Sequence, residues 1–326
     1  MTAGARLGLD DVERAAAIVG RHLPPTPLRR AYALRALRAP RPREVWLKLE
    51  CWQPTGSFKV RGALHNLATL DAAARRRGVV AASAGNHALG VAFAGATLGG
   101  VETTVYVPET APRAKIDKLR TFAVTVEVGG RTYDDAHDRA MDHVRRTGAT
   151  YVHAFDDPRT SAGQGTAALE IADTLPSVGT VVVPVGGGGL ITAMAVALKA
   201  RLPRVRVVAV QPEASPALRD SLAAGRALTD YAAGPTLADG LAGGIGTLVW
   251  EHRDLIDDVV TVNEAEIEAA IVALAAHDQV IAEGAGATGV AAVAAGRIAD
   301  DGRPVAVVVT GGNLDVSVLA RLLQRS

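Results

Sequence analysis

Thr180-Val-Val-Val-Pro-Val-Gly-Gly-Gly-Gly189 is the stretch with the clearest signature of the chain's architecture. Its first six residues form a nearly continuous apolar run, which is typical of a strand buried on both faces of a parallel sheet. Four glycines follow, and the alanine-rich segment 190–201 after them predicts a helix. A buried strand, a glycine turn and a helix in this order indicate the first half of a β-α-β unit.

The same alternation continues in both directions along the chain. The predicted strands cover residues 44–50, 78–83, 103–107, 124–128, 151–154, 180–185, 205–211, 259–262 and 305–310. The predicted helices cover residues 10–19, 57–70, 86–98, 112–122, 133–147, 158–175, 190–201, 264–276 and 314–323. This pattern predicts an α/β protein with parallel sheets, and no linker of unusual composition marks a domain boundary.

Composition excludes several classes of protein. The chain has 326 residues, of which 48% are hydrophobic, so we expect a globular protein. Its 35 Lys and Arg balance 34 Asp and Glu, which gives no electrostatic reason to expect nucleic acid or an anionic membrane as a partner. Cys51 is the single cysteine, so a disulfide within the chain is impossible.

No targeting or membrane segment is expected. Residues 1–20 lack the apolar core of a secretory signal, and no apolar run is long enough to span a bilayer. The chain ends soon after the predicted helix 314–323, so we expect no appended C-terminal regulatory module. The expected location is the cytoplasm.

Four strand-to-helix junctions are unusual, and in α/β proteins ligands bind where such junctions lie. The first is Pro54-Thr-Gly-Ser-Phe-Lys59, which places a lysine in the first turn of the predicted helix 57–70. The positive end of the helix dipole disfavours the charged amine. Burial would lower its pKa further from the ordinary ~10.4, toward a value useful for a Schiff base.

Two other junctions offer backbone N–H groups to anions. Ser83-Ala-Gly-Asn-His87 ends one strand and begins a helix, so its small residues suit a carboxylate, although Ser and Asn are also ordinary helix caps. Gly186–Gly189 exposes N–H groups that suit a phosphate. This run is not the dinucleotide fingerprint, because Ile191 occupies the last glycine position, and it is not a Walker A loop.

The fourth junction is Thr310-Gly-Gly-Asn313, which offers a hydroxyl at the end of the predicted strand 305–310. Together the four junctions supply an amine, two backbone anion sites and a neutral hydroxyl. Each group follows the carboxyl end of a strand. These are the groups needed to bind pyridoxal 5'-phosphate (PLP) and an amino acid.

On these motifs the sequence resembles the fold-type II PLP-dependent enzymes, and among them the serine/threonine dehydratase group, which also contains serine racemase. The resemblance runs from Pro24-Pro-Thr-Pro-Leu28 to the turn after Thr310. Further matching stretches are Lys48-Leu-Glu50, Gly56-Ser-Phe-Lys-Val-Arg-Gly-Ala63, Ser83-Ala-Gly-Asn-His-Ala88, Leu237-Ala-Asp-Gly240 and Ala282-Glu-Gly284.

The resemblance implies a tryptophan synthase β-like fold of two parallel-sheet α/β domains with the active site between them. Residues 1–50 and 155–326 would form a large cofactor-binding domain, and residues 51–154 a small substrate-binding domain. The family usually forms homodimers, so we expect a homodimer here.

The resemblance also implies roles for individual residues. Lys59 would be the catalytic residue, joined to PLP as a Schiff base. Around the cofactor it places Phe58 beside the ring, Asn86 at the 3'-oxygen, Gly186, Gly187, Gly188 and Gly189 at the phosphate, Thr310 at the pyridine nitrogen, and Gly240 and Glu283 near the ring. At the substrate carboxylate it places Ser83, Ala84, Gly85, Asn86 and His87.

The implied reaction is the elimination of water from a small L-β-hydroxy amino acid such as L-threonine or L-serine, which yields a 2-oxo acid and ammonia. Three alternatives stay open. One is a β-replacement synthase of the same fold, a second is a dehydratase of 3-hydroxyaspartate or phenylserine, and the third is a non-catalytic PLP-binding protein.

Two departures from the family pattern have consequences. Some relatives bind a divalent cation through carboxylates just after the strand that here covers 205–211, but this chain has Gln211 and Ala217, and Glu213 is out of register. We therefore expect no metal. In serine racemase a serine hydroxyl acts as the second acid/base at the position of Ala84, so we expect this chain to form almost no D-amino acid.

Overall fold

The computed structural model describes residues 6–36, 44–111 and 113–324, and these form two sheets. The larger sheet has the strand order β1-β2-β10-β7-β8-β9 and the smaller β5-β4-β3-β6. The larger sheet consists of β1 (Leu28–Arg30), β2 (Val45–Leu49), β7 (Thr180–Pro184), β8 (Arg206–Pro212), β9 (Asp258–Val262) and β10 (Val305–Val309). The smaller consists of β3 (Val79–Ala82), β4 (Thr103–Val107), β5 (Thr125–Val128) and β6 (Thr150–Tyr151).

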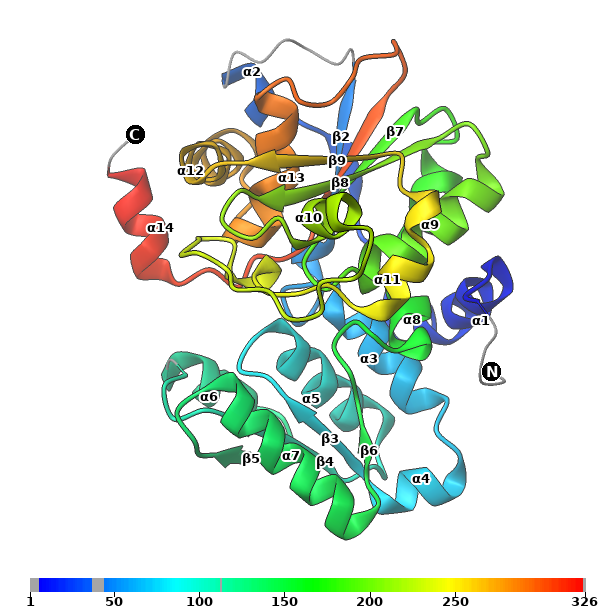
Figure 1. Cartoon of the computed structure of the whole chain (residues 1–326), viewed down its shortest axis with the longest axis vertical. Helices are drawn as coiled ribbons and strands as arrows, with labels where there is room; N and C mark the ends of the chain where they lie inside the picture. Colours follow the sequence, from blue (N-terminus) through cyan, green and yellow to red (C-terminus); the bar gives the residue numbers. More distant parts are fainter. Residues whose placement is uncertain (1–5, 37–43, 112, 325–326) are drawn as a thin grey trace.

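Nearly all strand pairs are parallel, as the sequence predicted. The exception is β1, an edge strand that runs antiparallel to β2 with Leu28 opposite Lys48. We call each sheet with its covering helices a lobe, and Figure 1 shows the large lobe above the small one. All strands of the small sheet fall between residues 79 and 151, and the large sheet is built from segments on either side. The roles expected of the two domains, cofactor binding and substrate binding, stay predictions.

Two layers of helices cover the large sheet. One layer packs on the core cluster that includes Val307 and Val182, and it contains α2 (Ala33–Ala36), α12 (Glu264–Ala273), α13 (Gly284–Ala294) and α14 (Val316–Leu323). The other packs on the cluster that includes Val181 and Val308, and it contains α1 (Leu9–Val19), α8 (Pro158–Thr174), α9 (Gly189–Arg201), α10 (Ala217–Ala224) and α11 (Thr247–Glu251). Because adjacent strand residues point to opposite faces, near-continuous apolar strands fill both cores.

Short helical turns complete the large lobe. Three are 3₁₀ turns, η1 (Glu50–Trp52), η2 (Asp239–Leu241) and η3 (Arg253–Leu255), and the fourth, η4 (Leu274–Asp278), is a π-helical turn that continues α12.

The small sheet is covered in the same way. On one face lie α3 (Lys59–Ala68), α4 (Ala72–Arg77), α5 (Asn86–Leu98) and α6 (Arg113–Arg120), whereas α7 (Tyr133–Thr147) covers the other. Helices α3 and α8 meet between the lobes (Figure 1), and their backbones approach closely. A Cβ on Gly62 would lie 2.5 Å from the Thr160 carbonyl oxygen, so the glycine permits this contact.

Each strand predicted from the sequence is present, with ends shifted by a few residues. The largest difference is at β6, where only Thr150–Tyr151 pair instead of the expected 151–154. The sequence did not predict β1, α2, α4, α10, α11 or α13. The helix predicted to begin at Pro112 begins at Arg113, and Pro112 lies outside the described residues.

A buried cluster of charges ties α3 to the large lobe. Arg61, which is 1% exposed, donates to both Glu50 carboxylate oxygens at 2.7 and 2.8 Å and to Glu170 at 2.7 Å. Lys48 binds Glu170 and the Thr26 carbonyl oxygen, so the two buried cations face two carboxylates. Burial alone would raise the pKa of Glu50, but Arg61 and its hydrogen bonds bring that pKa below its ordinary value.

Among the described residues, the structure has no helix with the length and apolar character needed to cross a membrane.

Candidate active site

Lys59 lies in the first turn of α3, as the sequence predicted, although the helix begins at Lys59 itself and not at residue 57, and the residue is partly exposed to solvent. Its Nζ donates to the Ala154 carbonyl oxygen at 2.9 Å and lies 5.1 Å from the centre of the Phe58 ring. Desolvation lowers the pKa of the amine from 10.5 to about 8, although the Glu283 carboxylate acts in the opposite direction. At pH 7 about a tenth of the amine is therefore neutral, against well under a thousandth for an ordinary lysine, and the neutral form is the one that a nucleophile or base requires.

The loop that holds Lys59 also touches the glycine run. Phe155 follows the Ala154 carbonyl, and a Cβ on Gly189 would lie 2.5 Å from the Phe155 carbonyl oxygen. The Phe155 ring lies against Gly187, where any side chain would overlap it. The Lys59 amine and the glycine run are thus placed by consecutive residues of one loop.

Gly186, Gly187, Gly188 and Gly189 follow β7 and begin α9. Their N–H groups have no acceptor among the described residues of the protein. Free N–H groups at a helix N-terminus, next to the positive end of its dipole, favour an anion such as a phosphate. Gly188 is required here for two reasons, because its φ is 92° and a Cβ would lie 2.5 Å from Val249 Cγ1.

Thr310 lies beside Phe58 and Lys59. The Phe58 N–H donates to the Thr310 carbonyl oxygen at 3.1 Å, and Ser57 pairs with Gly311 in a β-bridge. Thr310 is 3% exposed, and its hydroxyl has no hydrogen-bond partner among the described residues. Thr310 therefore lies at the end of β10 next to the backbone of Phe58 and Lys59, and its role at the pyridine nitrogen stays a prediction.

Asn86 and Glu283 meet across the two lobes. Asn86 Nδ2, from the first turn of α5, donates to Glu283 Oε1 at 2.6 Å. Desolvation raises the pKa of Glu283 from 4.5 to about 7, with the Asn86 hydrogen bond acting in the opposite direction. Glu283 also lies against Gly311, where a Cβ would overlap its carboxylate, so this pair adjoins the Thr310 turn.

The start of α5 forms a second set of free donors. The N–H groups of Asn86, His87 and Ala88 have no acceptor within the described parts of the chain. Gly90, one turn further along, packs on Lys59, because a Cβ there would lie 3.0 Å from the Lys59 carbonyl carbon. A carboxylate held at the start of α5 would therefore be near the lysine.

The side chains of this segment contribute differently from their backbone. Ser83 Oγ accepts the Gly85 N–H at 3.1 Å, and Ala84 is partly exposed between them. The His87 ring is buried, with Nε2 2.7 Å from the Val152 carbonyl oxygen, and desolvation lowers its pKa to about 3. Because this ring is neutral and bound to Val152, His87 offers an anion its N–H group and no positive charge.

Gly240, in η2, lies between the glycine run and α13. Its carbonyl oxygen would be 3.1 Å from a Cβ on Gly186, and its own Cβ would lie 3.4 Å from Ala285. All residues expected at the site therefore adjoin one another in space, from Ser83 at the start of α5 to Thr310 at the end of β10.

Gln211 stands where we expect no cation, and its side-chain amide makes hydrogen bonds within the protein. Gln211 is fully buried; its Nε2 donates to the Val185 carbonyl oxygen at 3.2 Å, and its Oε1 accepts the N–H groups of Leu218 and Arg219 at 2.9 and 3.2 Å. Gln211 thus caps α10 and holds the residue before Gly186. Glu213 is exposed, 3.9 Å from Arg297. Metal independence stays a prediction.

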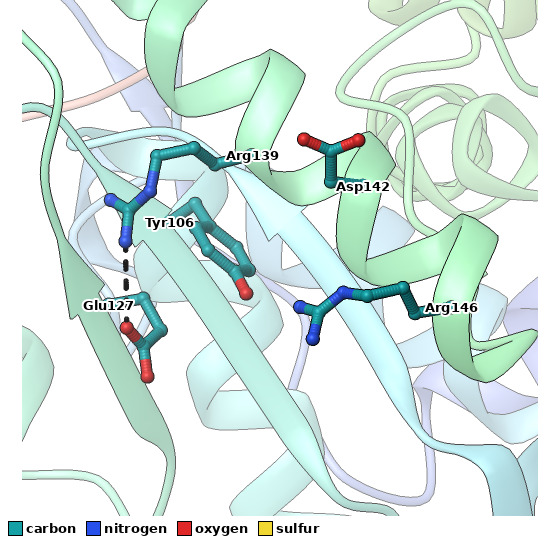
Figure 2. Close-up of a pocket in the computed structure, with 5 residues that line it drawn as sticks. All are labelled: Tyr106, Glu127, Arg139, Asp142 and Arg146. Carbon is teal, nitrogen blue, oxygen red and sulfur yellow. Dashed lines mark ion pairs between the residues drawn. The ribbon is translucent and has the colours of Figure 1, made fainter.

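A separate surface hollow of about 450 Å³ lies on the α7 face of the small sheet (Figure 2). It is lined by Tyr106, Glu127, Arg139, Asp142 and Arg146. Arg139 pairs with Glu127 at 3.7 Å and Asp142 binds Arg145, so its charges largely compensate one another. It contains none of the residues expected at the site, and we assign it no role.

Three residues at the site were given no role in the sequence analysis. Ala154 and Phe155 lie in the loop between β6 and α8, whose sequence carries no motif that would have indicated them. Asn313 was part of the recognised turn, but its contacts depend on residues far away in the sequence. The motif that contains Asn313 was visible in the sequence, but the contacts of the Asn313 side chain could not be predicted from it.

The fold and the site define an enzyme that carries a phosphate-bearing aldehyde cofactor on a lysine. The chain belongs to the family of pyridoxal-phosphate dependent enzymes, whose family model matches residues 19–311. Its cofactor is PLP. The residues present fit this cofactor, because free N–H groups are available for the phosphate and Lys59 has a lowered pKa.

Relatives and solved structures agree with this family. An L-threonine ammonia-lyase of Thermotoga maritima is 47% identical over 284 residues, covering 86% of this chain and 70% of the relative. A serine racemase from Dictyostelium discoideum superposes with a TM-score of 0.88 at 29% identity, covering 96% of this chain and all of the other. A threonine deaminase from Solanum lycopersicum gives 0.87 at 30%, covering 98% and 95%.

Proposed function

We propose that the chain is an ammonia-lyase that converts L-threonine to 2-oxobutyrate and ammonia by eliminating water, with L-serine as a second substrate. One observation carries this proposal. A lysine with a pKa of about 8 lies between two sets of free N–H groups, Gly186–Gly189 and Asn86–Ala88, which suit a cofactor phosphate and a substrate carboxylate. The similarity to two threonine ammonia-lyases, at 47% and 42% identity, supports the substrate class.

Different residues of the chain perform different steps of the proposed reaction. When bound, PLP supplies the electron sink that makes the substrate Cα acidic. Asn86, His87 and Ala88 N–H groups hold the substrate carboxylate, which fixes the Cα near Lys59. The neutral form of the Lys59 amine, favoured by its lowered pKa, accepts the Cα proton. The Thr310 hydroxyl would be the partner of the pyridine nitrogen of bound PLP, and because it carries no full charge it would favour prompt loss of the β-hydroxyl.

The roles of the two lobes, the oligomeric state and the location are proposed from the resemblance to the family. We propose that the large lobe binds the cofactor and the small lobe the substrate, and that the enzyme is a cytoplasmic homodimer. Half-exposed apolar side chains support the dimer. Trp52 is 49% and Ile281 52% exposed, and the residue that precedes Trp52, Cys51, lies with Ile281 around Gly312. A sedimentation-equilibrium mass equal to one chain would contradict the dimer.

The test is release of 2-oxo acid from a panel of β-hydroxy amino acids, with no second nucleophile added. L-Threonine should give 2-oxobutyrate, and Lys59→Ala should abolish turnover because its base and cofactor anchor are gone. Dependence on an added nucleophile would instead indicate a β-replacement synthase. A preference for 3-hydroxyaspartate or phenylserine would indicate a different dehydratase. A coloured protein inert toward the whole panel would indicate a binding protein.

The same assay reports stereochemistry. Ala84 has no hydroxyl with which to return a proton to the face opposite Lys59, so the residual amino acid after partial conversion should stay in the L form. Chiral chromatography measures this directly, and substantial D-threonine would remove the proposed role of Ala84.

A further inference from the structure

We infer that Asn313 is a positioning residue that sets which end of the Asn86 amide faces the cofactor. The inference rests on the proposed function, because it concerns the orientation of the residue expected at the 3'-oxygen of PLP. It depends on a chain of hydrogen bonds that runs from α6 through Asn313 to Asn86 and Glu283.

The orientation of Asn313 is fixed from two sides. Lys118 Nζ, in α6, donates to Asn313 Oδ1 at 2.6 Å, and an ammonium group can only donate. Asn313 Nδ2 donates to the Thr55 carbonyl oxygen at 2.8 Å, and a carbonyl can only accept. Exchanging the amide oxygen and nitrogen of Asn313 would break both hydrogen bonds.

Close packing holds the Asn313 side chain in this place. Gly56, with φ of 76°, lies beside it, and a Cβ on Gly56 would lie 2.6 Å from Asn313 Oδ1. The Gly312 N–H donates to the Gly56 carbonyl oxygen at 2.9 Å, which joins the two turns. The amide therefore has little freedom to rotate away from its partners.

The fixed orientation of the Asn313 amide in turn fixes the orientation of the Asn86 amide. Asn313 Nδ2 donates to Asn86 Oδ1 at 2.7 Å, so the oxygen of Asn86 is committed to Asn313. The Asn86 NH₂ group must point the other way, where it donates to Glu283 Oε1 at 2.6 Å. Asn86 consequently presents a donor to the site, and a donor is what an anionic 3'-oxygen requires.

The test compares Asn313→Asp with Asn313→Ala. A carboxylate cannot donate to Asn86, so the aspartate of the first variant would draw the Asn86 NH₂ toward itself and turn the Asn86 oxygen toward the cofactor. We expect PLP affinity, measured by titration of the resolved enzyme, to fall by about tenfold or more in N313D and by less in N313A. If Asn313 only filled space, the nearly isosteric aspartate would be the milder change.

A double-mutant cycle excludes a direct effect of the new charge. If Asn313 acts through Asn86, then N313D should weaken PLP binding by less than about twofold in an N86A background. An equal loss in both backgrounds, or a PLP affinity and cofactor absorption spectrum unchanged in N313D, would overturn the inference. Thermal unfolding of each variant without PLP separates folding defects from lost affinity.

Two further measurements complete the design. Asn263→Asp is the matched control, because Asn263 caps α12 through Oδ1, an atom that Asp retains. This variant should bind PLP as the unmodified protein does. Failure of the proposed function is distinguishable, because it would appear as unmodified protein that binds PLP and does not convert L-threonine. The double-mutant cycle measures PLP affinity, so its result is informative whether or not the protein converts L-threonine.

Discussion

Lys59 shows at the residue scale how a local environment creates reactivity. Desolvation lowers the pKa of its amine to about 8, against 10.5 for an ordinary lysine. A charged ammonium has no lone pair, so only the neutral amine attacks the PLP aldehyde. The neutral fraction grows as pH rises through the pKa, so a lowered pKa moves cofactor capture to lower pH.

We therefore expect the rate of PLP capture by the resolved enzyme to rise with pH and level off above about pH 8. Stopped-flow absorbance across a pH series measures it. Glu283→Gln removes the carboxylate that raises the pKa of Lys59, so the midpoint of this variant should move to lower pH. A midpoint near 10.5 in the unmodified protein would show that the amine is not desolvated.

Single residues also show what a sequence can indicate. Lys59, Asn86 and Gly186–Gly189 became candidates because each follows the carboxyl end of a predicted strand, a rule that needs no coordinates. The orientation of Asn313 was not predictable, because it depends on Lys118, 195 residues away, and Thr55, 258 residues away. Such contacts exist only once both lobes are assembled.

At the scale of elements, the turn between β7 and α9 depends on glycine for two separable reasons. Gly188 has φ of 92° and would meet Val249 Cγ1 at 2.5 Å if it carried a Cβ. Gly225, at the end of α10, has φ of 66° but no heavy atom within 4 Å of the same position. The two glycines share a positive φ and differ in crowding.

Alanine substitutions at these two positions separate the reasons. Gly225→Ala should lower the free energy of unfolding by about 1–2 kcal/mol, the cost of a left-handed alanine. Gly188→Ala should cost more, and it should also weaken PLP binding by about tenfold or more because the turn must shift. Chemical denaturation and PLP titration measure the two effects. Equal unfolding costs with unchanged PLP affinity in both variants would contradict the crowding at Gly188.

Helix α13 is the main element that sequence patterns missed. Its sequence, Gly284-Ala-Gly-Ala-Thr-Gly289 and onward, contains three glycines, which oppose helix formation, and it lacks an amphipathic period. The structure shows why glycine is present. A Cβ on Gly284 would overlap the Leu237 carbonyl, and one on Gly286 the Gly311 carbonyl. Tertiary contact, which local propensity does not record, makes this segment a helix.

At the scale of the whole molecule, the buried charges around Arg61 join the two lobes. Arg61 belongs to the helix that begins with Lys59, whereas Glu50 follows β2 and Glu170 lies in α8. Removing the guanidinium would leave two carboxylates, one of them fully buried, with only Lys48 to compensate them. Breaking a buried pair on one side costs about 3–5 kcal/mol.

Arg61→Ala should therefore lower the free energy of unfolding by about that amount, and the matched control is Arg201→Ala. Arg201 also bridges two carboxylates, Glu13 at 3.1 Å and Asp173 at 2.9 Å, but its side chain is 42% exposed. Its loss should cost less than about 1 kcal/mol, because solvent screens exposed pairs. Urea unfolding with saturating PLP measures both, and equal costs would contradict the importance of burial.

The state of Cys51 makes the protein convenient for labelling chemistry. It is the single cysteine of the chain, it is 7% exposed, and burial raises the pKa of its thiol to about 12. Maleimides react with thiolates at accessible positions, so the native thiol will stay unmodified under ordinary conditions. A cysteine introduced on each lobe, at exposed Asp117 in α6 and Arg253 in η3, would accept a donor and an acceptor dye without removal of Cys51. Single-molecule energy transfer between these dyes would then report directly whether the lobes approach each other when an amino acid binds.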